Sequence, residues 1–128
     1  MVVANKMVLF PGPRHPITTE PAGVRVVVSV AGQVIADSRS ARTLREADYP
    51  AVHYIPREDV DMTALERTDH ESYCPFKGDA AYFSIPAAGA RGLNAVWTYE
   101  TPYEAVSEIK DYVAFYTNRM DSVQELPL

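Results

Sequence analysis

The sequence predicts a small, mainly β domain of seven or eight short strands with one or two short helices. Runs rich in β-branched and aromatic residues recur along the chain, and turn-forming residues separate them. The 128 residues are 47% hydrophobic and 10% aromatic, which excludes a disordered chain and suffices for one core. We therefore expect a single domain over residues 1–128.

The first half of the chain predicts an arm, a hairpin and a further strand. Three prolines make residues 1–20 an extended arm, within which His15–Thr18 begins an edge strand. Val24–Val30 is the strongest strand signal, and a tight turn leads into a second strand at Val34–Asp37. Residues 38–47 permit a helical turn or a strand, and the regular spacing of turn signals favours a strand.

The second half predicts five more strands, over residues 51–55, 72–76, 80–85, 95–99 and 112–116. Acidic residues near its start favour a short helical segment at Arg57–Met62. Lys77–Asp79 is predicted as a turn, and Pro102–Lys110 as the best helix. Residues 121–128 are predicted to be a frayed tail.

Charge and composition restrict which classes of partner and which cellular compartment we expect. The chain has 12 basic and 17 acidic side chains, an excess of acid that argues against binding nucleic acid or an anionic membrane. No apolar run approaches the roughly 18 residues needed to span a bilayer, and the start of the chain shows no signal-peptide pattern. The one cysteine, Cys74, excludes an internal disulfide. We expect a cytoplasmic protein.

Motif searches disfavour several classes of site. Neither a Walker phosphate loop nor a Gly-x-Gly-x-x-Gly fingerprint is present, and there is no Cys-x-x-Cys pair for structural zinc. A mixed metal site would have to draw on His15, His53, His70 and Cys74. Scattered histidines and a lone cysteine more often solvate or pack, so we predict no metal and no cofactor.

Two polar groupings carry candidate chemistry. Cys74 becomes a nucleophile if Lys77 lowers its pKa or His70 acts as its base, and it is otherwise a packing residue. Arg57 and Lys77 both follow strands, where they would clamp a carboxylate or phosphate. The alternative for this pair is ordinary surface ion pairing, for example with Glu46.

Aromatic side chains are dense around the same segments: Tyr54, Tyr73, Phe76, Tyr82, Trp97 and Tyr99. A concave aromatic wall with a few polar groups is the usual form of a small-ligand site. The same residues would equally fill the core of a small β domain. If they are buried, their polar atoms need partners, which favours a polar network around Glu46 and Arg57.

Several long strings resemble one family in matching order: HPIT, GQVIADS, LREADYP, HYIPREDVDM, YCPFKGDAAYFSI, NAVWTYETPYEAV and DYVAFY. Together they resemble the bacterial domain-of-unknown-function family 427, which also carries a nucleotidyltransferase-like label. The resemblance implies a β-tent-like fold of small antiparallel sheets pinched together at one edge. The family's motif positions fall here on Glu46, Tyr54, Pro56, Arg57, Cys74, Lys77, Gly78, Tyr82, Trp97 and Tyr99.

The resemblance leaves three hypotheses. The first is binding of a small molecule with an anionic part in an aromatic pocket. Its ligand contacts would be Tyr54, Arg57, Lys77, Tyr82, Trp97 and Tyr99. If the protein is an enzyme, Cys74 and Glu46 would be the catalytic residues. The second is a structural or protein-interaction module without chemistry, present as a monomer or a homodimer. The third is nucleotidyl transfer with Mg²⁺ at Asp59 and Asp61, which lack a preceding Gly-Ser element.

Overall fold

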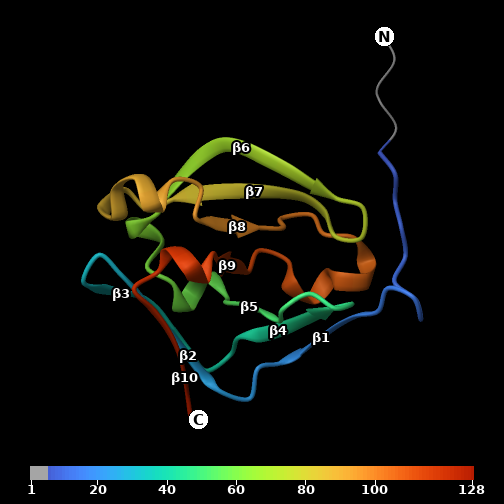
Figure 1. The fold of residues 1–128 in the computed structure, drawn as a ribbon, viewed down its shortest axis with the longest axis horizontal. Coiled ribbons are helices and arrows are strands. Elements are labelled where there is room, and N and C mark those ends of the chain that lie inside the picture. Colours follow the sequence, from blue (N-terminus) through green and yellow to red (C-terminus); the bar gives the residue numbers. More distant parts are fainter. Residues whose placement is uncertain (1–5) are drawn as a thin grey trace.

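The computed structural model describes residues 6–128, in which ten strands form three antiparallel sheets (Figure 1). One sheet has the order β1-β4-β5, a second β10-β2-β3 and a third β6-β7-β8-β9. The strands are β1 (Ile17–Pro21), β2 (Arg25–Val30), β3 (Gln33–Ser38), β4 (Arg42–Glu46), β5 (Val52–Tyr54), β6 (Glu66–Cys74), β7 (Gly78–Ser84), β8 (Val96–Thr98), β9 (Val113–Phe115) and β10 (Ser122–Leu126). The expected class, a small and mainly β domain of antiparallel sheets, is confirmed.

The helical content of the described residues is five short 3-10 segments. They are η1 (Arg57–Asp59), η2 (Met62–Ala64), η3 (Pro86–Gly92), η4 (Glu104–Ile109) and η5 (Thr117–Arg119). The helix predicted over Pro102–Lys110 is therefore shorter and tighter than a regular α-helix, with a kink at Val106. Val106 and Ile109 are both fully buried, and a spacing of three residues places them on one face of a 3-10 turn.

The β2–β3 hairpin is confirmed, and its turn explains the residues between the strands. Val30 pairs with Gln33, so Ala31 and Gly32 are the two central residues, with φ of 51° and 76°. Two positive φ angles are the signature of the turn type whose twist matches a hairpin. Glycine adopts this conformation without strain, whereas Ala31 does so at a cost.

Two local predictions need correction. Residues 122–126 are not frayed, because they form β10 and pair with β2 from Arg25 to Ser29. Without that partner, β2 would present an open edge beside a buried core. The turn predicted at Lys77–Asp79 lies slightly earlier, because Cys74 already pairs with Gly78. Gly78 has a φ of 107° and begins β7.

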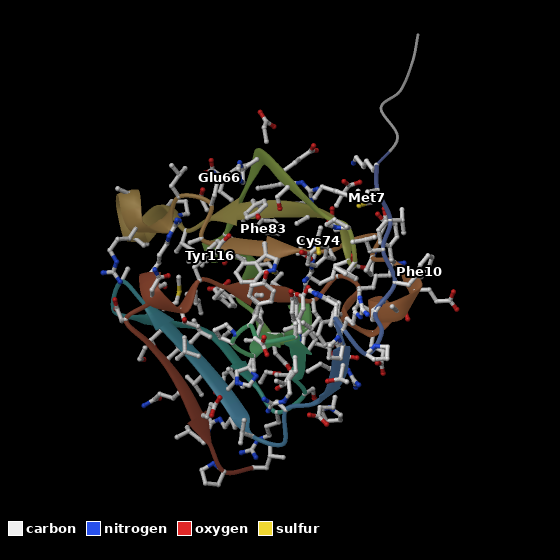
Figure 2. The ribbon with its side chains drawn as sticks, turned by 45° about the vertical axis from the view of Figure 1, so that its right-hand side comes forward. Met7, Phe10, Glu66, Cys74, Phe83 and Tyr116 are labelled. Carbon is white, nitrogen blue, oxygen red and sulfur yellow. The ribbon has the colours of Figure 1, made fainter. Side chains whose placement is uncertain are left out.

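The predicted arm, residues 1–20, is only partly an arm. Residues 1–5 lie outside the described residues, and β1 from Ile17 onward pairs with β4 as an edge strand. Between them the chain runs along the end of the β6–β7 hairpin, where the Leu9 amide donates to the Pro75 carbonyl at 2.9 Å. Figure 2 shows Phe10 standing away from the body of the protein, and it is 82% exposed.

The three sheets close around two apolar clusters. The first cluster includes Val26, Val28, Ile55, Phe83, Val96 and Phe115. The second, which surrounds the candidate site, includes Leu44, Tyr54, Tyr82, Tyr99, Val106 and Ile109. Ile55 and Val113 exchange two backbone hydrogen bonds of 2.8 Å, which fasten the end of β5 to β9 and so join two sheets at one edge.

Candidate functional site

A small cavity opens beside the second cluster, and we call it the tyrosine pocket. It has a volume of about 190 Å³ and is lined by Leu44, Glu46, Tyr49, Pro50, Val52, Tyr54, Lys77, Tyr82, Trp97, Tyr99 and Tyr116. Six of the eight candidate residues named from the sequence line it: Glu46, Tyr54, Lys77, Tyr82, Trp97 and Tyr99. An aromatic cluster with one acid and one base therefore occupies a single place in the fold.

Strand pairing explains why these residues meet. Tyr82 on β7 lies directly opposite Trp97 on β8. Leu44 and Glu46 are two residues apart on β4, so they share a face, and Tyr54 ends the neighbouring strand β5. The site thus takes its walls from two different sheets, and the Ile55–Val113 junction holds those sheets together.

The aromatic rings of the pocket contact one another, Tyr54 and Trp97 edge to face and the other pairs at a tilt. The Tyr54 and Trp97 rings are 6.3 Å apart at 89°, and the Trp97 Nε1–H donates to the Tyr54 hydroxyl at 3.1 Å. Tyr116 packs on the other side of Trp97 at 4.7 Å. Burial raises the pKa values of Tyr54 and Tyr99 well above the ordinary value, so both hydroxyls keep their protons.

The polar end of the pocket is a buried ion pair. The Lys77 ammonium donates to one oxygen of Glu46, and the His15 Nε2 lies 2.8 Å from the other. The side chains of Lys77 and Glu46 are only 10% and 13% exposed. Burial by itself raises the pKa of Glu46, but the hydrogen bonds from Lys77 and His15 outweigh it and hold that pKa below its usual value.

Sequence reasoning treated His15 only as a metal-ligand candidate and missed its place beside Glu46. His15 stacks face to face on Phe76, with ring centroids 4.0 Å apart and planes within 2°. That contact orients the imidazole toward Glu46 and ties the arm before β1 to the turn after β6. The HPIT string, which begins with His15, was the signal that this segment matters. It does not indicate the partner of His15, because Glu46 lies 31 residues further along the chain.

The Tyr99 hydroxyl is a polar group of this pocket that forms no hydrogen bond within the protein. Tyr99 is 6% exposed, and its hydroxyl forms no hydrogen bond with any residue among 6–128. Tyr82, in contrast, shares a hydrogen bond of 2.8 Å with Ser72. Arg42 Nε is the one fully enclosed polar side-chain atom without a partner among residues 6–128, so the Tyr99 hydroxyl is not sealed off, and we take it as a donor open to the cavity that Tyr99 lines.

The structure places Arg57 away from the tyrosine pocket. Its guanidinium donates to the Asp111 carbonyl at 2.8 Å, to the Thr98 hydroxyl at 3.2 Å and to Glu100 at 3.1 Å. Arg67 donates to the same carboxylate, and together these hydrogen bonds lower the pKa of Glu100 to about 2. The expected clamp of Arg57 with Lys77 is therefore not formed, and Arg57 instead fastens η1 to the segments around β8.

Cys74 also lies outside the lining of the tyrosine pocket. It is half-buried and packs against the second cluster (Figure 2). His70, the other candidate base, packs edge to face against Tyr82 with ring centroids 4.4 Å apart. Lys77 is committed to Glu46. The surroundings of Cys74 are those of a packing residue.

The acidic pair considered for Mg²⁺ is engaged in local structure. Asp59 accepts from the Ser38 hydroxyl at 2.7 Å, and Asp61 caps η2 by accepting from the Thr63 amide at 3.1 Å. Within residues 6–128, no three or more His, Cys, Asp or Glu side chains are grouped to hold a metal ion. No helix of the described chain is long and apolar enough to cross a membrane.

Comparison with known proteins places the chain in a family. No curated protein matches it. A family model described as "Domain of unknown function (DUF427)" matches residues 18–125, which include every strand from β2 to β9 and all eight candidate site residues. The match covers most of the chain, and the protein therefore belongs to the DUF427 family.

Proposed function

We propose that the protein binds a small carboxylate-bearing molecule in the tyrosine pocket. The observation that carries this proposal is the hydroxyl of the buried residue Tyr99, which has no hydrogen-bond partner among residues 6–128 and lines the same cavity as Lys77. A buried donor of this kind gains a hydrogen bond when an acceptor enters the cavity.

The remaining polar atoms of the pocket also favour an acceptor. The Tyr54 hydroxyl accepts from Trp97, and its own proton has no acceptor among the described residues. The Lys77 ammonium has three protons, of which the bond to Glu46 uses one. Each Glu46 oxygen already accepts one hydrogen bond, from Lys77 or from His15, so the acid has partners before any ligand binds. The pocket therefore offers donors to its ligand.

Size and charge restrict the ligand further. A cavity of about 190 Å³ lies below the roughly 300–1,000 Å³ that is typical of sites for drug-sized molecules. It accommodates a single ring or a short chain. Glu46 neutralises Lys77, so the net charge of the lining does not favour a multiply charged ligand, and the preference for a carboxylate rests on its capacity to accept several hydrogen bonds.

The proposal is tested by titrating the protein with benzoate and, as an uncharged comparison, benzyl alcohol. Trp97 is the only tryptophan and its indole N–H donates to the Tyr54 hydroxyl, so its signal in a nitrogen–proton NMR spectrum responds to a ligand in the pocket, and Tyr99→Phe shows whether the ligand is bound there. Benzoate should shift this signal in a saturable way, and Tyr99→Phe should weaken its binding by about tenfold, as expected for one hydrogen bond to a charged acceptor.

Tyr112→Phe is the matched control, because Tyr112 packs against the second cluster but does not line the pocket. It should leave benzoate binding unchanged. Equal binding of benzoate by the wild type and Tyr99→Phe would refute the proposal, as would an indole signal that neither compound moves. The second result would favour the alternative of a module without a ligand, in which Tyr54 and its neighbours only fill the core.

Catalysis remains a separate prediction. Glu46 would have to release His15 or Lys77 before it could take a proton, because both of its oxygens are occupied. Cys74 would have to reach a ligand from outside the lining of the pocket. The binding proposal requires neither step.

A further inference from the structure

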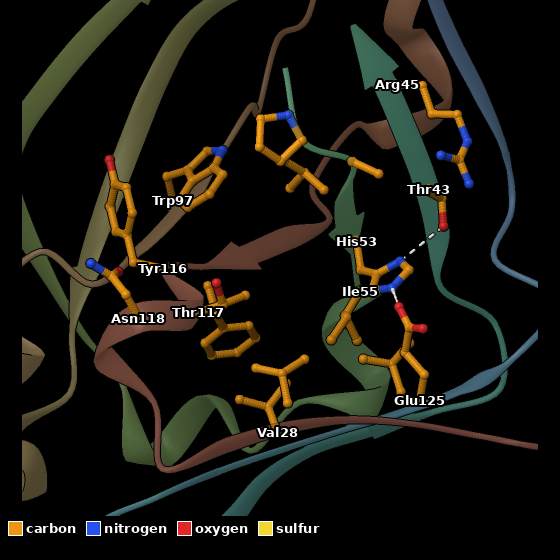
Figure 3. Close-up of a pocket in the computed structure, with 16 residues that line it drawn as sticks. Val28, Thr43, Arg45, His53, Ile55, Trp97, Tyr116, Thr117, Asn118 and Glu125 are labelled. Atoms are coloured by element: carbon orange, nitrogen blue, oxygen red, sulfur yellow. Dashed lines mark hydrogen bonds and ion pairs between the residues drawn. The ribbon is translucent and has the colours of Figure 1, made fainter. Parts of the chain in front are cut away.

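A second and larger cavity lies on the far side of Trp97, between the β10-β2-β3 sheet and the β1-β4-β5 sheet (Figure 3). We call it the inter-sheet cavity, and its volume is about 710 Å³. Its floor is apolar and comes from Val26, Val28, Ile55 and Phe115, all of which are buried. Pro50 and Ala51, which also line the cavity, are exposed, so the cavity opens to solvent.

One wall of the inter-sheet cavity carries a chain of three hydrogen-bonding side chains. Thr43 on β4 is paired with His53 on β5, and the Thr43 hydroxyl lies 2.8 Å from His53 Nδ1. His53 Nε2 lies 2.6 Å from Glu125 on β10. Figure 3 shows this chain bridging the two sheets along one side of the cavity.

The chain has a defined direction of donation when His53 is neutral. A carboxylate can only accept, so the Nε2 proton is donated to Glu125, and Nδ1 accepts the proton of the Thr43 hydroxyl. Both ring nitrogens are then used. The second oxygen of Glu125 has no hydrogen-bond partner among residues 6–128, and Glu125 is 58% exposed. An acceptor is therefore available near the mouth, above an apolar floor.

We propose that the inter-sheet cavity binds an uncharged small molecule with a compact apolar body and an N–H or O–H head that donates to Glu125. The volume falls within the range of small-molecule sites, and such sites combine an apolar lining with few polar groups. Arg45 and Glu125 both line the cavity and carry opposite charges, so the lining has no excess of either sign to favour an ion. This site goes beyond the proposed function and does not rest on it.

The two cavities are neighbours with separate access. Pro50, Val52, Trp97 and Tyr116 line both of them and form the partition. Ala51 lines only the inter-sheet cavity and is exposed. A larger side chain at Ala51 would therefore obstruct the inter-sheet cavity without entering the core or the tyrosine pocket.

The test uses N-phenyl-1-naphthylamine, an uncharged aromatic dye with one N–H whose fluorescence rises in apolar surroundings. We expect a saturable increase with one dye bound per chain. Ala51→Phe should weaken binding by about tenfold or more by occupying the space. Glu125→Ala should weaken it by about tenfold, because it removes a charged acceptor. Glu66→Ala, a change of another exposed acid that lines neither cavity, should have no effect.

The head group is tested with 1-phenoxynaphthalene, which has an ether oxygen in place of the N–H of the dye. It should compete with the dye for the cavity, but with an affinity about tenfold below that of the dye itself. Dye fluorescence that does not saturate, or that is unchanged in Ala51→Phe, would overturn the proposal. Benzoate binding in Ala51→Phe separates the two sites. Ala51→Phe should bind benzoate like the wild type, whereas Tyr99→Phe should bind benzoate about tenfold more weakly and bind the dye unchanged.

Discussion

The buried pair of Glu46 and Lys77 makes a strong prediction about stability. In Glu46→Gln the Lys77 ammonium stays in place but loses its countercharge. Both side chains are about seven-eighths buried or more, so the energetics of buried rather than surface pairs apply. Breaking such a pair by removing one partner costs about 3–5 kcal/mol, and we take about 3 kcal/mol because some solvent access remains.

For a chain of this length, a loss of about 3 kcal/mol lowers the unfolding temperature by about 10 °C. The assay is urea unfolding at pH 7, followed by the fluorescence of Trp97. A second variant, Glu46→Gln combined with Lys77→Met, removes both charges and should recover most of the stability, since replacing a buried pair with neutral groups is often neutral.

The same pair predicts a dependence on pH. The pKa of Glu46 is lower in the folded protein than its ordinary value of 4.5, so protonation favours the unfolded chain. The stabilisation is complete above about pH 4.5 and is lost as the pH falls through the folded pKa. The reasoning fails if Glu46→Gln unfolds within about 0.5 kcal/mol of the wild type, or if the double variant is no more stable than Glu46→Gln.

Three further predictions test other parts of the fold. Gly92→Ala should lower the free energy of unfolding by about 3 kcal/mol or more, measured by thermal unfolding, because the added Cβ would lie 2.1 Å from the Ile85 carbonyl oxygen. Gly12→Ala is the control and should leave stability unchanged, because the space around Gly12 is open. Ala31→Asn should stabilise the protein by about 0.5–1 kcal/mol in the same assay, because asparagine tolerates the positive φ of the β2–β3 turn better. The Glu100 carboxyl should titrate at about pH 2 by NMR, so its contribution to stability is present above about pH 4.5 and is lost as the pH falls toward 2; a value near 4.5 would contradict the pairing with its two arginines.

Most of the strands were predictable because their signals are local. The valine-rich run of β2, the turn at Ala31 and Gly32, and the return strand lie within a few residues of one another, so propensity and turn chemistry agree. The tail shows the converse. The β10 segment has a weak pattern of its own and becomes a strand only because β2, near the other end of the chain, offers it an edge.

The candidate site divides in the same way. Six residues of the tyrosine pocket were named from aromatic density and from the family resemblance, and the structure brings them together. Arg57 was assigned to the wrong neighbourhood, because its Glu100 partner lies 43 residues away and nothing local indicates that pairing. His53 was considered only as a metal ligand, since its partners Thr43 and Glu125 come from different sheets.

The sequence by itself determined the fold class, the positions of most strands and the types of side chain that gather near the tyrosine pocket. These follow from propensities and periodicities that operate over a few residues. Only the tertiary structure decided which acid pairs with which base, which tyrosine hydroxyl is left open and where the two cavities lie. Those features depend on distances between segments far apart in the chain, and such distances exist only once the three sheets have packed together.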